Sequence, residues 1–292
     1  MTASRRFPSD RLAVNPLAYW MTGTATRRTR EVVERAFADA AAVGFERVKA
    51  DVLEGSSPEQ YARWLEGLGL RPALSMFLST LDRAVPLADD LERARRYAAE
   101  QSALGAHATM ISAIFVPERT PHPAIGAEFR ADRLAQVIDD LGAIAEVLTA
   151  EGVRPLLHPH VSGWIETEYE TERALESIPP GVLGFGPDTG HLAWAGMDPA
   201  VMIARHAERV GALHLKDIKA SAFDRVAGDY ATRTGSRAIW TEPGTGVIDF
   251  DEVFAALPAD FEGEFVIEVD VPTSSPRESL AAQRRWAASY FA

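Results

Sequence analysis

Two histidines and a glutamate lie close together in residues 156–167, which read LLHPHVSGWIET. His158 and His160 follow an apolar run, and Glu166 comes after a Gly-Trp pair. Imidazole and carboxylate groups bind divalent metals, and imidazole also transfers protons near neutral pH. The stretch alone fits a metal site, an acid–base pair or the end of a buried strand, so its relation to other polar stretches must distinguish them.

Ionisable residues also occur at the ends of three later apolar runs. They are Asp188 in VLGFGPD (182–188), His214 and Lys216 in ALHLKDI (212–218), and Glu268 and Asp270 in FVIEVDV (265–271). Residues two apart in a strand share a face, so the two histidines of the first stretch share one, and so does each later pair. Charged groups are costly to bury unless they are paired or bound to a metal. These stretches therefore predict a site with paired or metal-bound charges.

Strand-like apolar runs alternate with helical patterns along the chain. The eight predicted strands are 11–20, 45–52, 70–79, 107–116, 153–160, 182–188, 212–218 and 265–271. Eight strand–helix units in 292 residues predict an α/β fold, a single-domain (β/α)8 TIM barrel over residues 11–292. A doubly wound open sheet is the alternative, but no G-x-G-x-x-G turn is present. Residues 1–10 are predicted to be a flexible N-terminal tail.

Helix ends are marked by local signals. Ser57, Pro58 and Gln60 have the pattern of a helix N-terminus, and Gly44 has that of a helix C-terminus. The segment 220–241 reads as a long irregular loop, which we expect to be a lid or a subunit contact.

The C-terminal ends of the predicted strands carry the ionisable residues described above, together with Asp51. TIM barrels have their active sites at that face, whereas their interior is normally filled by Val, Ile and Leu. An Asp, a His and one or two Glu that converge there form a mixed oxygen and nitrogen ligand set. Such a set suits Mn²⁺, Mg²⁺ or Co²⁺, with Zn²⁺ as an alternative.

Composition excludes several classes of function. The chain has a formal net charge of −12 and no cysteine. The charge argues against nucleic-acid binding, which needs a cationic surface, and the lack of cysteine excludes disulfides and thiolate metal sites. No apolar run approaches the length of a membrane span, and no signal-peptide pattern is present. We expect a soluble, cytoplasmic protein that acts without membrane or nucleic acid, with a homo-oligomer as an alternative to a monomer.

Five stretches resemble one known superfamily. They are HPHVSGWIET (158–167), PDTGHLAWAGMDP (187–199), LHLKDIK (213–219), EPGTGVIDF (242–250) and FVIEVD (265–270). Together they resemble the xylose isomerase-like TIM-barrel superfamily, and within it they are most similar to the inosose dehydratase and sugar phosphate isomerase/epimerase branch.

The resemblance implies a divalent metal held by four ligands from strands five to eight. Asp188, His214 and Glu268 match three of these ligands. Many relatives have a Glu followed two residues later by a His at the end of strand five, and here His158 replaces that Glu. The fourth ligand is therefore expected to be Glu166, with His158 as the competing choice. The expected metal is Mn²⁺ first, with Mg²⁺, Co²⁺ or Zn²⁺ as alternatives.

The resemblance also implies a reaction on a small-molecule sugar or cyclitol. A proton next to a carbonyl group would be removed through an enediolate, as in inosose dehydratase. His160 is the candidate base, and His191 or Lys216 would protonate the departing hydroxyl or stabilise the oxyanion. Candidate substrate contacts are His158, Trp20 and Trp194, the two tryptophans being expected in loops above the barrel.

Simpler roles compete with each assignment. Asp188 could cap a turn, Lys216 could reach solvent, and His214 or Glu268 could be an ordinary core or ion-pair residue. A sugar phosphate isomerase or epimerase, a nuclease related to AP endonucleases and a non-catalytic metal- or sugar-binding barrel are the alternative functions. In strand two, Lys49 and Asp51 occur where relatives often have Glu, so some substrate contacts are expected to differ.

Overall fold

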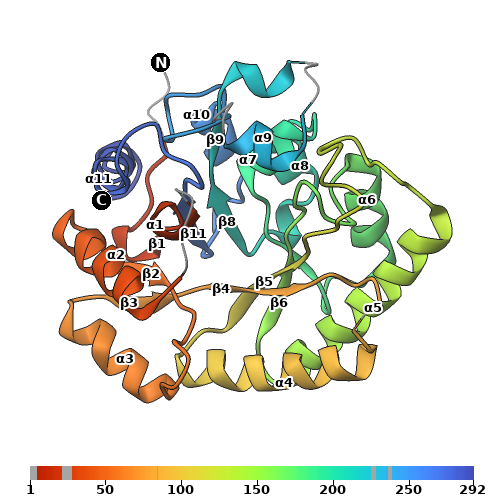
Figure 1. The fold of residues 1–292 in the computed structure, drawn as a ribbon, viewed down its shortest axis with the longest axis horizontal. Helices are drawn as coiled ribbons and strands as arrows, with labels where there is room; N and C mark the ends of the chain where they lie inside the picture. The colour runs from red at the N-terminus through yellow and green to blue at the C-terminus, as the bar shows by residue number, and fades with distance from the viewer. Residues whose placement is uncertain (1–4, 22–27, 84, 225–227, 236–238) are drawn as a thin grey trace.

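The computed structural model describes residues 5–21, 28–83, 85–224, 228–235 and 239–292, and these form a parallel TIM barrel (Figure 1). One sheet has the order β3-β2-β1-β11-β8 and the other β4-β5-β6-β7. The barrel strands are β1 (Leu12–Asn15), β2 (Arg47–Lys49), β3 (Arg71–Ala73), β4 (Ser75–Ser79), β5 (Ala108–Ala113), β6 (Arg154–Leu157), β7 (Gly184–Phe185), β8 (Ala212–Leu215) and β11 (Glu264–Glu268).

Two junctions close the barrel. On one side β3 and β4 follow each other directly along the chain and occupy the third strand position. On the other side the β7 segment meets β8 through two parallel bridges, Phe185 with Val210 and Asp188 with His214. The eight predicted strand positions are thus confirmed, and the second bridge brings two predicted metal ligands side by side.

Helices alternate with the strands, and the longer ones surround the strands on the outside (Figure 1). They are α1 (Ala18–Met21), α2 (Arg30–Ala42), α3 (Pro58–Gly67), α4 (Leu87–Ala103), α5 (Ala131–Ala150), α6 (Glu168–Ser177), α7 (Thr189–Trp194), α8 (Pro199–Arg205), α9 (Tyr230–Thr234), α10 (Phe250–Ala255) and α11 (Pro276–Ala287), with 3-10 turns η1 (Ser9–Arg11), η2 (Ala207–Arg209) and η3 (Ala220–Phe223). None of the helices in the described residues has the length and apolar character needed to cross a bilayer.

The predicted helix start at Ser57 is confirmed. The Ser57 side chain accepts a hydrogen bond from the Gln60 backbone, and the Gln60 side chain accepts one from the Ser57 backbone. Such a reciprocal cap satisfies two backbone donors that the first helical turn leaves free. Thr167 and Glu170 form the same arrangement at the start of α6, directly after the HPHVSGWIET stretch.

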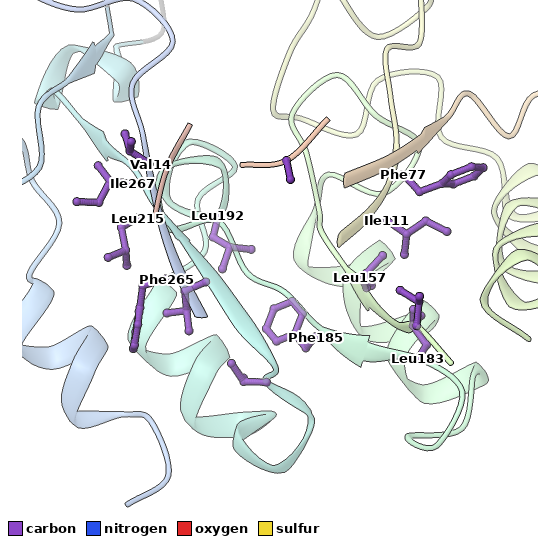
Figure 2. Packing of buried hydrophobic residues seen from close by; sticks show 14 of the residues in the cluster. Val14, Phe77, Ile111, Leu157, Leu183, Phe185, Leu192, Leu215, Phe265 and Ile267 are labelled. Carbon is purple, nitrogen blue, oxygen red and sulfur yellow. The ribbon is translucent and has the colours of Figure 1, made fainter. Parts of the chain in front are cut away.

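Apolar residues on alternate strand positions form two cores. Outward-facing residues such as Val14, Ile111 and Leu157 pack between the strands and the helices, and Figure 2 shows part of this core. A second cluster fills the barrel interior with Ala13, Ala73, Leu74, Met110, Leu156, Ala212 and Val266. The next inward positions on β6 and β8 are His158 and His214, so the interior changes from apolar to ionisable towards the C-terminal ends of the strands.

Residues 5–10 differ from the predicted flexible tail. Phe7 is buried, and its backbone exchanges hydrogen bonds with Tyr290 and Ala292. Its ring packs on Phe254, Phe265 and Phe291. The apolar side chain therefore joins the N-terminal segment to the C-terminal end, while residues 1–4 lie outside the described residues.

Two further predictions of irregular structure were wrong. Trp20 and Trp194 lie in the short helices α1 and α7 rather than in loops. The segment 220–241 contains η3, α9 and the strand β10 (Trp240–Thr241), which pairs antiparallel with β9 (Asp217–Ile218).

Candidate metal centre

Three side chains from successive strand ends meet inside the barrel mouth. His158 directly follows β6, Asp188 precedes α7, and His214 lies in β8. All three are buried, and one ligand atom from each lies within 4.8 Å of the others. This is the only group of at least three metal-ligand side chains found among the described residues.

The two carboxylate oxygens of Asp188 have different surroundings. Oδ1 accepts a hydrogen bond of 2.9 Å from the His191 backbone and so caps α7. Oδ2 has no hydrogen-bond partner among the described residues and lies 4.0 Å from His158 Nε2 and 3.8 Å from His214 Nδ1. The sequence left a cap and a metal ligand as alternative roles of Asp188. The two roles are compatible, because each uses a different oxygen.

The two histidines present unpartnered nitrogens to the same space. His158 Nδ1 lies 3.1 Å from the Gly186 carbonyl oxygen, so this nitrogen carries the proton and Nε2 has a free lone pair. Neither ring nitrogen of His214 has a hydrogen-bond partner within the described chain. Buried polar atoms without partners are costly, and a divalent cation would engage Asp188 Oδ2, His158 Nε2 and one nitrogen of His214. The residues present therefore fit a divalent metal.

Glu268 borders this group and is held by an ion pair. Its Oε2 lies 3.8 Å from His214 Nδ1 and accepts a hydrogen bond from the Asn15 side chain. Its Oε1 accepts a hydrogen bond of 2.6 Å from Lys216 Nζ. Glu268 thus has one oxygen directed towards the three-residue cluster and one engaged by a cation.

Lys216 is buried among carboxylates rather than extended into solvent. Its side chain is 1% exposed, and Nζ lies 2.7 Å from Asp270 and 3.6 Å from Asp188. The ammonium group also stands 4.8 Å above the Trp240 ring. The alternative in which Lys216 reaches solvent was therefore wrong.

The charges of this site shift the pKa values in opposite directions. Burial raises the pKa of Asp188 to about 7, against the opposing charge of Lys216. Burial alone would raise the pKa of Glu268, but Lys216 and His214 hold it well below its usual range. Burial would lower the pKa of Lys216, but Asp270, Glu268 and Asp188 raise it well above its usual value. Lys216 therefore stays charged, while Asp188 titrates near neutrality.

The histidines of the site are neutral at pH 7. Burial lowers the pKa of His160 to about 3 and that of His214 to about 4. Burial and the neighbouring histidines hold the pKa of His158 and His191 well below the usual value. Neutral imidazole is the form that binds metals and accepts protons.

His160 and His191 stack beside the cluster. Their ring centroids are 3.7 Å apart, and His191 Nε2 lies 3.4 Å from Lys216 Nζ. His160 Nδ1 lies 2.7 Å from the Val161 carbonyl oxygen, so its Nε2 is free to accept a proton. The structure thus brings all three predicted catalytic residues, His160, His191 and Lys216, into one buried group.

Glu166 lies apart from this group, contrary to the expectation that it is the fourth metal ligand. Its carboxylate accepts hydrogen bonds from the backbones of Ser162, Ala124 and Gly126 at 2.7, 3.0 and 2.8 Å. Arg119 Nη1 also lies 3.8 Å from it. The carboxylate is therefore used to join the loop after β5 to the loop after β6, and the geometry favours His158 as the ligand.

The two tryptophans expected to contact substrate have different positions. Trp194 packs on Tyr230 and Trp240, whose rings lie against His160 and His191. It therefore supports the wall of the site from behind. Trp20 is half-buried on α1, where the Arg28 guanidinium lies 5.6 Å from its ring.

Several residues of the site were not predicted. They are Asn15, Ser112, Phe115, Tyr230 and Trp240. Asn15 ends β1 and Ser112 is buried on β5 with its hydroxyl unpartnered, so both could have been found from the strand-end rule. The three aromatic residues come from the loop after β5, from α9 and from β10, and only the tertiary structure brings them to His160, His191 and Lys216.

Comparisons with known proteins agree with this fold. Residues 32–290 match the family model described as xylose isomerase-like TIM barrel. An inosose dehydratase from Geobacillus thermodenitrificans is 32% identical over 155 residues, which are 51% of this chain and 52% of that protein. The chain thus spans about half the length of the curated relatives it matches.

Two solved structures have a similar fold at low sequence identity. A probable 3-DHS dehydratase, AsbF from Bacillus anthracis, has a TM-score of 0.74 at 14% identity, covering 95% of this chain and 98% of that one. The IolI protein, solved with a bound zinc atom, has a TM-score of 0.70 at 13% identity, covering 97% and 99%. With the family match over most of its length, this chain belongs to the xylose isomerase-like TIM-barrel family.

Proposed function

We propose that this protein is an enzyme that uses a divalent metal to remove a proton next to a carbonyl group of a sugar or cyclitol, as an inosose dehydratase does. The observation that carries the proposal is the buried group of His158, Asp188 and His214, whose ligand atoms face one another beside the Lys216–Glu268 ion pair. The relative named inosose dehydratase supports the substrate class.

The proposed metal ligands are His158, Asp188, His214 and Glu268. A bound divalent metal would supply Lewis-acid polarisation of the carbonyl and neighbouring hydroxyl oxygens of the substrate. This set has two imidazoles, whereas the expected set with Glu166 has one. The additional nitrogen ligand favours Zn²⁺, Co²⁺ or Mn²⁺ over Mg²⁺. The zinc atom in the IolI structure is consistent with this preference.

His160 is proposed as the base. Its free Nε2 and its neutral state at pH 7 allow it to accept the proton from the carbon next to the carbonyl. The Phe115 ring packs edge-on against the imidazole at 5.1 Å and helps to fix its orientation.

Lys216 is proposed to stabilise negative charge on the substrate rather than to remove a proton. The surrounding carboxylates keep it protonated, so it offers a fixed positive charge where an oxyanion develops. His191 lies within 3.4 Å of Lys216 Nζ; because its imidazole is neutral, it is proposed to hydrogen-bond to the departing hydroxyl group or to the oxyanion. The proton that the leaving group needs would come from Lys216 or from the His160 imidazolium that proton removal forms. Loss of that group as water gives a dehydratase, whereas return of the proton elsewhere gives an isomerase or epimerase.

Hydrogen–deuterium exchange at the carbon next to the carbonyl tests this proposal. The purified protein would be incubated in D₂O with inososes and ketoses, once with Zn²⁺, Co²⁺ or Mn²⁺ and once with EDTA. We expect metal-dependent exchange on at least one substrate, with water loss identifying a dehydratase and an isomeric product identifying an isomerase or epimerase.

Glu268→Gln provides the matched variant. It keeps the shape of the side chain but removes the charge that pairs with Lys216 and faces His214. Metal-dependent turnover should be abolished in this variant. Full metal content together with full turnover would overturn the scheme, and absence of exchange by the wild type on every substrate would favour a non-catalytic binding barrel.

A further inference from the structure

Positive charge is distributed unevenly around the barrel mouth. On the side of β8 and β11, Lys216 stands within 3.6 Å of three carboxylates, those of Glu268, Asp270 and Asp188. Three carboxylates and the oxyanion of the proposed reaction already engage this lysine, so it is not available for a separate acidic group of the substrate. A substrate with an acidic group needs a cation elsewhere.

The side of β2 has a lysine with fewer partners. Lys49 Nζ lies 2.8 Å from Asp51, and Arg28 lies 3.5 Å from the same carboxylate. Ser75 also donates a hydrogen bond to Asp51. Among the described residues, Asp51 is the one hydrogen-bond partner of Lys49 Nζ, so the ammonium group keeps N–H donors for a further anion.

Lys49 faces the interior of the barrel near the candidate metal centre. Its strand neighbour Val48 belongs to the outer core, whereas its register partner on β3, Ala73, belongs to the interior cluster. The charge of Lys49 is also among those that lower the pKa of His214. Its side chain is 13% exposed, so it is open to a ligand in a way that Lys216 is not.

Lysine is rare in this chain, so a lysine at position 49 is unusual. Of the 30 basic residues, 27 are arginine and only Lys49, Lys216 and Lys219 are lysine. Two of these three lie on inward positions at the strand ends. A lysine offers a compact charge on a flexible stem, whereas arginine presents a rigid planar fork.

We infer that Lys49 binds a carboxylate group of the substrate, so that the enzyme acts on an acidic polyhydroxy compound rather than on a neutral cyclitol. This rests on the proposed function and names its substrate class. Asp51 and Arg28 would hold the lysine in place. A single ammonium group matches a monoanionic carboxylate, whereas a phosphate monoester carries nearly two charges.

Isothermal titration calorimetry with the metal-loaded protein at low ionic strength measures the affinities that test the inference. The probes are quinate, a cyclitol with one carboxylate, and myo-inositol, a cyclitol without one. Wild-type protein should bind quinate more tightly than myo-inositol. Lys49→Met should lower the ratio of the two affinities by about 10- to 100-fold, the value of a hydrogen bond to a charged group.

Two further variants make the result specific. Lys49→Arg keeps the charge and should retain most of the preference for quinate. Lys219→Met removes the lysine that is not assigned to the site and should leave the preference unchanged. Glycerol phosphate as a third probe distinguishes a phosphate site, which tighter binding than quinate would reveal and which would overturn the assignment.

Other outcomes also decide the question. Equal affinity of the wild type for quinate and myo-inositol, or an unchanged ratio in Lys49→Met, would overturn the inference. Metal-dependent proton exchange on neutral inososes in the same preparations would show that the proposed function survives this failure. Selective quinate binding without proton exchange would support the role of Lys49 and contradict the proposed function.

Discussion

At the scale of single residues, Asp188 joins a helix cap to the candidate metal centre. Its Oδ1 caps α7 and its Oδ2 faces His158 and His214 without a hydrogen-bond partner among the described residues. The cap fixes the direction of the second oxygen. The carboxylate is therefore held in place for a metal before any metal binds.

Metal affinity should fall as the pH drops below about 7. Burial raises the pKa of Asp188 to about 7, so below that pH a metal must displace a proton from this carboxyl. His214 has a pKa of about 4 and His158 one well below its usual value, so neither competes near pH 6. We expect an affinity loss of about tenfold per pH unit below 7 and release of about one proton per metal at pH 6.

Titration calorimetry in buffers of different ionisation enthalpy measures this proton release. Affinity that is constant between pH 6 and 8 would contradict the raised pKa of Asp188. Release of two or more protons at pH 6 would indicate that the histidines titrate as well.

His158 and Glu166 should differ in their effect on metal content. His158→Ala removes a nitrogen that faces Asp188 and should weaken metal binding by more than the 10- to 100-fold typical of an outer-shell partner. Glu166→Gln should retain one metal per chain, because Glu166 bonds to loop backbones instead. Elemental analysis after dialysis measures both, and the opposite pattern would restore Glu166 as the ligand.

At the scale of elements, two loops form the wall beside His160. The loop after β5 carries Arg119, which donates hydrogen bonds to Glu170 on α6 at 3.0 and 2.6 Å and to the Gly163 carbonyl oxygen at 2.9 Å. Glu166 adds the three backbone contacts between the same loops. These buried contacts hold the segment that bears His160.

Arg119→Met should destabilise the protein strongly. It leaves the buried Glu170 carboxylate without its cation, and breaking such a pair typically costs about 3–5 kcal/mol. Urea unfolding measures the loss, and the double variant Arg119→Met with Glu170→Gln, which removes both charges, should recover part of it. A loss below about 1 kcal/mol for the single variant would show that the pair contributes little to holding the loops.

At the scale of the whole molecule, barrel closure brings the ligands together. Asp188 and His214 pair at the bridge that joins the two sheets, while Asn15 on β1 bonds to Glu268 on β11. The candidate metal centre therefore spans the junction between the sheets. A bound metal should stabilise the folded barrel as a unit.

Metal removal should lower the midpoint of thermal unfolding. A metal present at 100 times its dissociation constant stabilises a protein by about 2.7 kcal/mol, which corresponds to several degrees for a chain of this size. Calorimetric scans with EDTA and after readdition of Zn²⁺ or Mn²⁺ measure the shift. His158→Ala should show a much smaller shift, and an equal shift in this variant would place the stabilising metal elsewhere.

Much of the barrel could be predicted because its signals are local. Apolar alternation gave the eight strand positions, and the Ser57–Gln60 pattern gave the start of α3. The strand-end rule also selected Asp188, His214, Lys216 and Glu268. The structure gathers these residues because parallel strands of a barrel end at a common mouth.

The partners of each side chain were less predictable. Glu166 looked like a metal ligand beside two histidines, but backbone donors from the loop after β5 engage its carboxylate. Phe7 looked like part of a flexible tail, but three phenylalanines distant in the chain surround it. Neither contact has a local signal in the sequence.

The sequence by itself therefore determined the barrel and the residue types available at its mouth, because strand alternation and helix caps depend on neighbours in the chain. Only the tertiary structure decided which of those residues face one another. It favoured His158 over Glu166 at the candidate metal centre, buried Lys216 among carboxylates and left Lys49 with Asp51 as its one hydrogen-bond partner among the described residues. These outcomes depend on contacts between strands and loops that are far apart in the chain, where the local pattern carries no information.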